Sequence, residues 1–194
     1  MDTILLATKN KGKIKEMRDI IKNVNITSLD DFDIEEPKET GSTFAENSSL
    51  KAKYYGEKLK ISAIADDSGL CVDGLNNFPG IYSARFNNGC KDYSYSFNAL
   101  ELLLKYNNIR DYSAHFVCNV SFYDFNTKIT TSFEGVVKGK LKFPPSGNGG
   151  FGYDPIFVPD SYSKTFGEMS ADEKNTISHR ARAIKKLSLW YQNR

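Results

Sequence analysis

The stretch AIADDSGLCVDG, residues 63–74, joins an apolar run to a polar one. The apolar residues of 61–65 predict a short buried strand. Asp66 and Asp67 then stand where this strand leaves the core, and Ser-Gly follows at once. Two carboxylates at the end of a buried strand point to a functional site, whereas a turn with two solvated carboxylates is the structural alternative.

Upstream of this strand, the sequence predicts a strand, a turn and a helix, followed by a second helix. Residues 3–7 form a short apolar run, and residues 11–23 carry apolar side chains at helical spacing. Thr43 followed by Glu46 is a capping box, which predicts a helix from Thr43 to about Leu59. These segments favour β-α units.

Downstream, the pattern changes to antiparallel strands. Residues 67–92 are rich in Gly, Asn and Asp and predict a long functional loop, after which apolar residues between 97 and 104 mark a helix. Alternation over 112–122 and 129–137, on either side of a DFNT turn, predicts a long hairpin. The fold class is therefore α/β, with a mixed β-sheet flanked by helices and an antiparallel part.

Composition favours one large domain with a small-molecule partner. The chain has 194 residues, 40% of them hydrophobic and 26% charged, which is enough for one substantial core. A net charge of +2 gives no basic field that would indicate a nucleic-acid partner. The N-terminal residues are too polar for a signal peptide or a membrane span, and no later run reaches about 18 apolar residues. We therefore expect a soluble, cytoplasmic protein.

Counts of cysteine and histidine restrict the chemistry. Cys71, Cys90 and Cys118 are odd in number and show no CxxC spacing, so reduced and mostly buried thiols are expected. The only histidines are His115 and His179, which excludes a His-rich metal site. A divalent ion would be held by oxygen atoms, as Mg²⁺ or Mn²⁺ is, and a general base would be a carboxylate.

The loop TKNKGK, residues 8–13, lies between the predicted first strand and first helix and holds three lysines around Gly12. Backbone N–H groups at a helix N-terminus, together with ammonium groups, form an anion site that suits phosphates. The loop lacks the spacing of a Walker A motif. A solvated basic turn is the alternative.

The stretch GNGGFG, residues 147–152, matches the spacing G-x-G-x-x-G of dinucleotide-binding proteins. That fingerprint must open a helix, but Tyr-Asp-Pro follows here and Pro159 comes soon after, so we exclude it. The glycines instead allow the backbone to approach a ligand, with Phe151 and Tyr153 as flat faces for a base. An ordinary Gly-rich turn is the alternative.

The segment of residues 170–187 opens with another capping box and carries a cluster of polar and basic groups. On one regular helix, Lys174 and His179 would point in directions about 140° apart. We therefore predict a break, with Ser178 capping a final helix. His179 and Arg180 would then lie at the positive end of that helix, or would be ordinary surface charges.

Four segments in this order resemble the inosine/xanthosine triphosphate pyrophosphatase family: TKNKGK, ETGSTFAEN, IADDSGL…PGIYSARF and GGFGYDPIF…EKNTISHRARA. The resemblance spans residues 5–187. It implies one elongated, two-lobed domain over residues 1–194, with a long mixed sheet and an active-site cleft between the lobes. It also implies a homodimer that uses Mg²⁺ to hydrolyse ITP, dITP or XTP to the monophosphate and pyrophosphate, with no nucleic-acid or membrane partner.

The resemblance assigns roles motif by motif. Asp67 matches the general base and metal-linked aspartate, Asp66 would help it to place Mg²⁺, and Ser68 matches a substrate contact. The triphosphate loop of the family matches Thr8, Lys9, Asn10, Lys11, Gly12 and Lys13. Its base-binding FGYD matches Phe151, Gly152, Tyr153 and Asp154, and its last motif matches Lys174, His179 and Arg180. Phe151 would stack on the purine, and Arg180 would help to read the 6-oxo group.

Two departures from the family pattern bear on the site. The family often has Glu-Glu before Thr-Gly, where this chain has Lys38-Glu39. Either Glu39 or Glu36 would take the metal-linked role, or the ion would be held mainly by Asp67 and phosphate oxygens. Lys9 replaces a common glycine and would add a phosphate contact or face water.

The sequence is also compatible with two other functions. A nucleic-acid-binding protein could use the 13 Phe and 11 Tyr to stack on bases, but it would leave the acidic stretch without a purpose. A different nucleotide enzyme, such as a hydrolase of standard or sugar nucleotides, could use the same parts. A panel of substrates would separate these functions.

Overall fold

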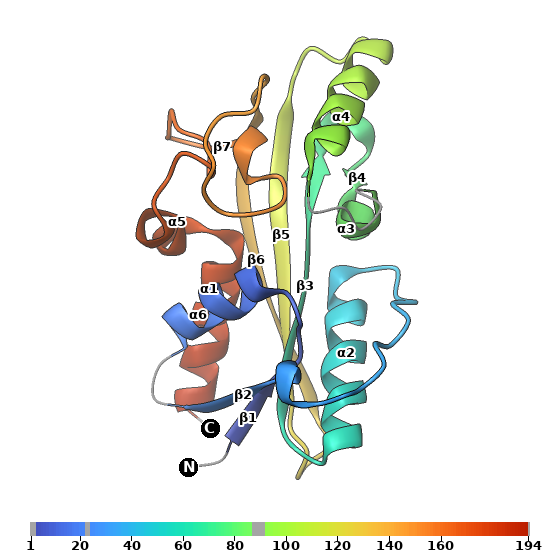
Figure 1. The fold of residues 1–194 in the computed structure, drawn as a ribbon, viewed down its shortest axis with the longest axis vertical. Helices are drawn as coiled ribbons and strands as arrows, with labels where there is room; N and C mark the ends of the chain where they lie inside the picture. The colour runs from blue at the N-terminus through green and yellow to red at the C-terminus, as the bar shows by residue number, and fades with distance from the viewer. Residues whose placement is uncertain (1–2, 22–23, 87–91, 194) are drawn as a thin grey trace. The chain divides into compact units, whose positions relative to one another are not determined.

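The computed structural model describes residues 3–21, 24–86 and 92–193 (Figure 1). The chain divides into two compact units. Unit 1 comprises Met1–Asp67, Cys118–Gly135 and His179–Arg194, and unit 2 comprises Ser68–Val117 and Val136–Ser178. That both units act as one pyrophosphatase domain stays a prediction.

A seven-stranded sheet has the order β2-β1-β3-β5-β6-β7, with β4 paired to β3. Its strands are β1 Thr3–Leu6, β2 Asn25–Ser28, β3 Ala63–Val72, β4 Phe78–Pro79, β5 Ser113–Tyr123, β6 Thr130–Leu141 and β7 Phe157–Pro159. β1 pairs in parallel with β2 and β3, whereas the β3–β4 and β6–β7 pairs are antiparallel. The predicted mixed sheet is therefore confirmed.

Among the helices of the described residues, α1, α2 and α5 begin at a residue whose side chain caps the helix. They are α1 Lys11–Ile20, α2 Phe44–Leu59, α3 Ser83–Phe86, α4 Ser94–Tyr106, α5 Ala171–Ile177 and α6 His179–Gln192. The Thr43 hydroxyl accepts a hydrogen bond from the backbone N–H of Glu46 at 3.1 Å, as the capping box predicts. Such a cap contributes about 1 kcal/mol to helix stability. The predicted end of the first helix, at residue 23, lies outside the described residues.

Unit 1 has two separate cores, one on each face of its part of the sheet (Figure 1). Because successive side chains of a strand point to opposite faces, Ile4 and Leu6 pack with α1 and α6, whereas Leu5 and Ala7 pack with α2. The same alternation continues in β3, where Ile64 belongs to the first core and Ala65 to the second. The next two residues of β3 are Asp66 and Asp67, so this alternation decides where each one points.

The strand predicted at 61–65 is longer than expected. β3 continues to Val72, so Asp66 and Asp67 lie within a strand and not at its end. The predicted loop over 67–92 was wrong in part, since it contains the second half of β3, β4 and α3. Asp, Ser and Gly have low strand propensity, which hides the strand in the sequence, but pairing and burial in the sheet override that propensity.

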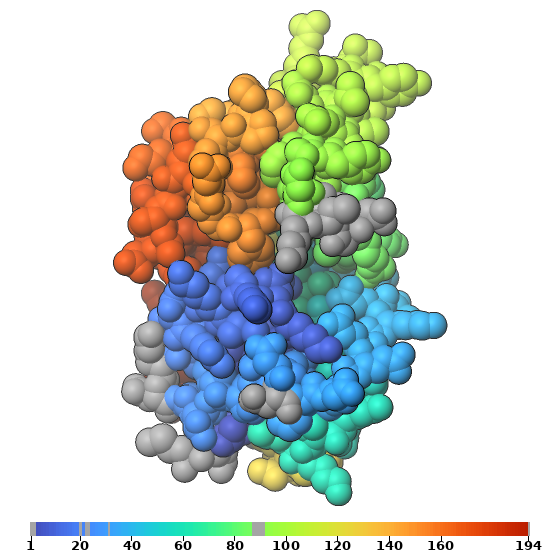
Figure 2. Space-filling view, viewed as in Figure 1, coloured from blue at the N-terminus to red at the C-terminus, as the bar shows by residue number. Residues whose placement is uncertain are grey.

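Unit 2 is built around aromatic side chains of the long hairpin and the segment after it. The ring of Phe116 lies 4.7 Å from that of Phe157, measured between centroids, and 6.1 Å from that of Phe166. All three aromatic side chains are buried, and Phe116, which belongs to the hairpin, packs inward as the alternation predicts. On α4, by contrast, Tyr95, Leu102 and Tyr106 are exposed, and this helix lies at the molecular surface (Figure 2).

The predicted break near residue 178 is confirmed. α5 ends at Ile177, Ser178 has an extended backbone with ψ of 155°, and α6 starts at His179. The rejection of a dinucleotide fingerprint is also supported, since Gly147 and Gly152 have positive φ and only a 3-10 turn, Asp154–Ile156, follows them. Among the described helices, none is both long and apolar enough to cross a membrane.

Candidate functional site

Asp66 and Asp67 are both buried, with 2% and 7% of their surfaces exposed, and they point to opposite faces of the sheet in unit 1. Asp66 faces α1 and α6, where it contacts Lys13 and Arg180. Asp67 faces α2, where it contacts Lys51. The expectation that the two carboxylates act together on one ion is therefore corrected, because neighbouring residues of a strand alternate between its faces.

Asp66 is the centre of a buried charge cluster. Its Oδ2 atom lies 3.0 Å from Lys13 Nζ and 3.2 Å from Arg180 Nη2, and Arg180 also pairs with Glu16. Burial alone would raise the pKa of Asp66, but Lys13 and Arg180 outweigh it and hold that pKa well below its usual range. Asp66 is therefore an anion that the fold itself has neutralised.

Arg180 and His179 start α6 and are almost completely buried, Arg180 being 1% exposed. Gly135 of β6 allows this first helical turn to come close, because a Cβ at that position would lie 2.1 Å from the carbonyl oxygen of His179. The guanidinium of Arg180 is committed to Asp66 and Glu16. The alternative that Arg180 is an ordinary surface charge is therefore excluded. Its role in reading a purine stays a prediction.

Asp67 lies among polar groups of a different kind. Its Oδ2 atom accepts a hydrogen bond from Asn47 Nδ2 at 3.2 Å, and its Oδ1 atom lies 3.4 Å from Lys51 Nζ. Lys51 Nζ also contacts Glu39 Oε1 at 2.7 Å. Glu39, and not Glu36, is therefore the glutamate that shares a partner with Asp67.

The single positive charge of Lys51 does not balance the two carboxylates that it contacts, those of Asp67 and Glu39. Burial raises the pKa of Asp67, and neighbouring Glu39 and Asp66 raise it further, while Lys51 lowers it. Burial also acts against the charge of Lys51, but Asp67, Asp66 and Glu39 outweigh it, so the pKa of Lys51 is raised. A carboxylate with a raised pKa beside excess negative charge suits a general base that also attracts a cation.

The donor set on this face fits a hard divalent ion. Glu39 and Asp67 supply carboxylate oxygens that approach the same point, occupied here by Lys51 Nζ. Within residues 3–21, 24–86 and 92–193, no group of three or more His, Cys, Asp or Glu side chains could hold a metal ion. Mg²⁺ is commonly held by one or two carboxylates together with substrate phosphates, so two carboxylates are sufficient.

Sequence reasoning missed Asn47 and Lys51, as well as Glu16. The signal was available in part, because residues four apart on a helix share a face, and α2 was predicted from its capping box. Asn47 is completely buried. An amide side chain is seldom buried unless it has a hydrogen-bond partner, and that partner here is Asp67. The sequence did not show that this face of α2 meets Asp67.

The stretch of residues 8–13 follows β1 as predicted, but only residues 8–10 form the connection, and residues 11–13 are the first turn of α1. Asn10 caps α1 through its side-chain oxygen, which accepts a hydrogen bond from the N–H of Lys13 at 3.2 Å. Lys9 and Lys11 are exposed, and Lys9 Nζ donates to the carbonyl oxygen of Ile34 at 3.3 Å. Lys13 differs from them because it is paired with Asp66.

Unit 2 holds a second cluster, formed by Lys174, Asp154 and Phe151. Lys174 Nζ lies 2.7 Å from Asp154 Oδ2, and both side chains are buried. The same Asp154 oxygen accepts a hydrogen bond from the backbone N–H of Phe151 at 2.7 Å, and Lys174 Nζ lies 4.8 Å from the centroid of the Phe151 ring. Asp154 thereby holds the backbone of Phe151 in position, and Lys174 holds its ring.

The prediction for Tyr153, which belongs to the same motif, was wrong. We expected its ring to offer a flat face to a base, but only 4% of its surface is exposed. Its ring packs edge-on against Tyr93 at 5.1 Å between centroids, and its hydroxyl donates to the carbonyl oxygen of Ser83 at 2.9 Å. Tyr153 therefore anchors the motif to the core of unit 2, and Phe151 is the aromatic residue left for a ligand.

Glu168 forms hydrogen bonds that hold the loop around Ser146, which precedes the motif of residues 151–154. Its carboxylate accepts hydrogen bonds from the backbone N–H of Thr165 at 2.8 Å and from the hydroxyl of Ser146 at 2.7 Å. These bonds lower the pKa of Glu168 to about 2. Because the unfolded chain has a pKa of about 4.3, this carboxylate stabilises the fold above that pH and loses its effect as the pH falls toward 2.

Glu168→Gln is therefore expected to lower the melting temperature near pH 7, by an amount that shrinks as the pH is lowered toward 3. Thermal melts of both proteins from pH 3 to pH 7 measure this. A difference that stays constant with pH would contradict a role for the charge.

The two described cysteines behave as the sequence predicts. Cys71 and Cys118 are buried, and Cys90 lies outside the described residues. Burial raises the pKa of Cys118 to about 12, and the carboxylate of Asp66, whose Oδ2 atom lies 3.9 Å from Cys118 Sγ, acts in the same direction. Cys118 is therefore a protonated core residue and not a nucleophile.

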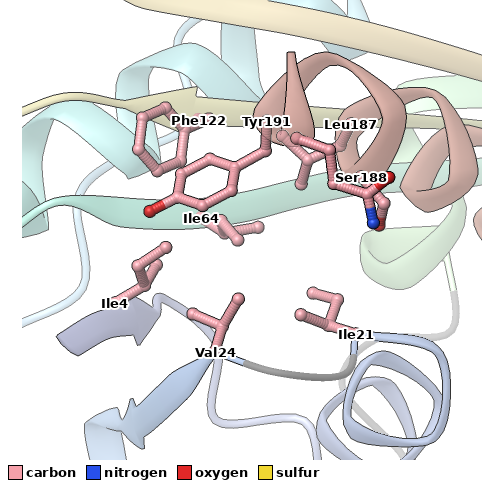
Figure 3. A pocket seen from close by; sticks show the side chains of 9 residues that line it. Ile4, Ile21, Val24, Ile64, Phe122, Leu187, Ser188 and Tyr191 are labelled. Atoms are coloured by element: carbon pink, nitrogen blue, oxygen red, sulfur yellow. The ribbon is translucent and has the colours of Figure 1, made fainter. Parts of the chain in front are cut away.

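A cavity of about 270 Å³ in unit 1 is distinct from these clusters (Figure 3). Its lining is mostly apolar and consists of Ile4, Ile21, Val24, Ile64, Phe122, Leu187, Ser188, Tyr191 and Gln192. No charged side chain of the described residues belongs to that lining. The cavity does not suit a triphosphate.

Solved structures with this fold are similar over the whole chain. A HAM1 protein from Coxiella burnetii matches with a TM-score of 0.91 and 34% sequence identity, covering 100% of both chains. A structure from Mycobacterium abscessus, described as a nucleoside-triphosphatase and dITP/XTP pyrophosphatase, matches with a TM-score of 0.78 and 36% identity. That match covers 95% of this chain and 98% of the other.

Curated relatives agree with these structures. A protein of Aquifex aeolicus named dITP/XTP pyrophosphatase is 41% identical, over 95% of this chain and 94% of its own. One from Staphylococcus epidermidis with the same name is 43% identical, over 95% and 93%. The family model described as the Ham1 family matches residues 4–190. The resemblance seen in the four sequence motifs is thus confirmed, and the chain belongs to the Ham1 family.

Proposed function

We propose that this protein is a pyrophosphatase that hydrolyses non-standard purine nucleoside triphosphates, such as dITP, ITP and XTP, to the monophosphate and pyrophosphate. The observation that carries this proposal is the group of Asp67, Glu39, Lys51 and Asn47 in unit 1. Relatives above 40% identity over nearly the full length are named dITP/XTP pyrophosphatase, which supports the same reaction.

Asp67 is proposed as the general base. Its raised pKa suits a carboxylate that accepts a proton from the attacking water, and Asn47 and Lys51 hold its two oxygens in place. The water oxygen bonds to phosphorus as the phosphoanhydride bond breaks, and pyrophosphate leaves. Little covalent work is required of the protein in such a transfer, so orientation and charge decide the rate.

Glu39 and Asp67 are proposed to hold Mg²⁺ together with phosphate oxygens of the substrate. When bound, this ion would neutralise charge that develops on the phosphate oxygens. The exposed lysines of the first loop, Lys9 and Lys11, would add positive charge for a triphosphate at the N-terminus of α1. Lys13 contributes indirectly while it is paired with Asp66.

Phe151 is proposed to stack on the purine, since Asp154 and Lys174 preset its position. Selectivity for a 6-oxo purine requires hydrogen-bond donors facing position 6, and the amino group of adenine would leave such donors unpaired. A mismatch of that kind can lower kcat/KM by about 10⁴-fold or more. Arg180 and His179 remain the sequence-based candidates for these donors.

The test is pyrophosphate release from a panel of dITP, ITP, XTP, GTP, ATP and dTTP, each with Mg²⁺ and again with EDTA. We expect rapid release from the first three nucleotides only, and its loss in EDTA. Equal release from ATP and dTTP would instead indicate a general nucleotide hydrolase. Absence of release from all six would refute the proposed reaction.

The homodimer and the cytoplasmic location are also part of the proposal. The dimer is what the resemblance of the four sequence motifs to the family implies. Light scattering after size-exclusion chromatography would give about twice the chain mass of 21.9 kDa for a dimer. A monomeric mass at micromolar concentration would contradict it.

A further inference from the structure

A chain of hydroxyl groups lies between α2 and the hairpin β5–β6 in unit 1. Ser48 Oγ is 2.9 Å from Asn119 Oδ1 and 2.7 Å from Ser121 Oγ. Two more serines extend the chain outward: Ser132 Oγ is 2.7 Å from Ser121 Oγ, and Ser49 Oγ is 3.1 Å from it. Ser48 and Ser121 are completely buried, and Asn119 is 4% exposed.

Polar side chains at these positions need an explanation, because a helix packed on a sheet normally meets it with apolar side chains. Elsewhere on this face α2 does so, with Ala52 and Tyr55 in the core. Each serine hydroxyl donates once and accepts up to twice, so the observed contacts can satisfy the buried groups. Hydrogen bonds are directional, whereas apolar contacts are not, so this cluster fixes how α2 lies on the strand more narrowly than an apolar contact would.

The residues fixed in this way adjoin the candidate base. Ser48 follows Asn47 directly in α2, and Lys51 lies one turn on; both Asn47 and Lys51 contact Asp67. Asn119 and Ser121 belong to β5, which neighbours β3 in the sheet. The hydroxyl chain therefore ties the helix that carries two partners of Asp67 to the strand beside the one that carries Asp67.

We propose that Ser48, Asn119 and Ser121 are positioning residues for the hydrolysis: they hold α2 so that Asn47 and Lys51 reach the Asp67 carboxylate. In the described residues, the hydrogen bonds of that carboxylate come from Asn47 and Lys51. The three residues therefore act through Asn47 and Lys51. The inference rests on the proposed function for its effect on rate, but not for its effect on the Asn47–Asp67 hydrogen bond.

Ser121→Ala is the first test, because alanine removes the hydroxyl and almost no packing volume. The matched control is Val120→Ala, which changes the adjacent residue of β5 on the opposite face, in the core formed with α1 and α6. For Ser121→Ala we expect kcat for dITP to fall about 10- to 100-fold, as for a small misplacement of a catalytic group, with KM changed less than about twofold. Val120→Ala should lower the melting temperature at least as much while keeping kcat.

A second readout does not depend on turnover. In ¹⁵N-labelled full-length protein, the side-chain amide signals of Asn47, assigned through their loss in Asn47→Asp, report its hydrogen bond to Asp67. These signals should shift or broaden in Ser121→Ala and in Ser48→Ala, and should return toward the wild-type positions in Ser121→Thr, which restores a hydroxyl. Val120→Ala should leave them in place.

Unchanged Asn47 signals together with wild-type kcat in both serine variants would overturn the inference. Equal losses of kcat in Ser121→Ala and Val120→Ala would also overturn it, since general destabilisation would then explain the effect. If the wild-type protein releases no pyrophosphate from any nucleotide, the proposed function fails, and the Asn47 signals still decide the positioning role. If Ser121→Ala does not fold, Ser48→Ala carries the same comparison.

Discussion

Asp67→Asn is expected to lower kcat for dITP by about 10²- to 10⁴-fold, the range typical for loss of a positioned general base. Asparagine keeps the shape of the side chain, but it accepts no proton from water and offers a metal ion one neutral oxygen. The measurement is pyrophosphate release at saturating dITP and Mg²⁺.

Stability separates loss of chemistry from loss of fold in this variant. Because the pKa of Asp67 is raised in the folded protein, its ionised form costs stability at any pH above that pKa. The variant should therefore melt at the wild-type temperature or higher near pH 7.5. A matched control is Asp73→Asn in unit 2, an exposed partner of His115 that should keep full turnover. Wild-type turnover in Asp67→Asn would remove Asp67 as the base.

Arg180→Gln is expected to lower the free energy of unfolding by about 3–5 kcal/mol, the range for breaking a buried ion pair from one side. The change leaves Asp66 with Lys13 as its close cation, and it leaves Glu16 without the guanidinium. Urea unfolding near pH 7 measures the loss. Little or no loss would contradict the structural role of Arg180.

The double variant Asp66→Asn/Arg180→Gln is the control for this prediction. If the two groups stabilise each other, the double variant should lose less stability than the sum of the single variants, because no unpaired charge remains from the pair. The ratio of dITP to dATP turnover in Arg180→Gln tests the other role. A changed ratio with unchanged stability would assign Arg180 to purine reading and not to the charge cluster.

Features set by near neighbours in the chain were predicted well. The capping boxes at Thr43 and Ser170 place the starts of α2 and α5, because a cap needs only a side chain and an N–H three residues later. The hairpin followed from alternation of apolar residues around one turn. The connection between β1 and α1 and the break at Ser178 also followed from local patterns.

Features set by distant parts of the chain were missed or corrected. The length of β3 depends on neighbouring strands, so Asp66 and Asp67 appeared to end a strand that continues beyond them. Asn47 and Lys51 became part of the site only because α2 packs beside Asp67. The burial of Tyr153 depends on the core of unit 2, which no local pattern near that residue describes.

The family resemblance of four sequence motifs predicts the reaction class, and the residue types show which charged groups are available. How those charges are divided depends on the tertiary structure. Alternation along β3 turns one aspartate toward Lys13 and Arg180, where its charge is neutralised, and the other toward Lys51 and Glu39, where its pKa is raised. Two adjacent carboxylates thus acquire opposite properties, since burial and neighbouring charge, both set by folding, govern the protonation of each.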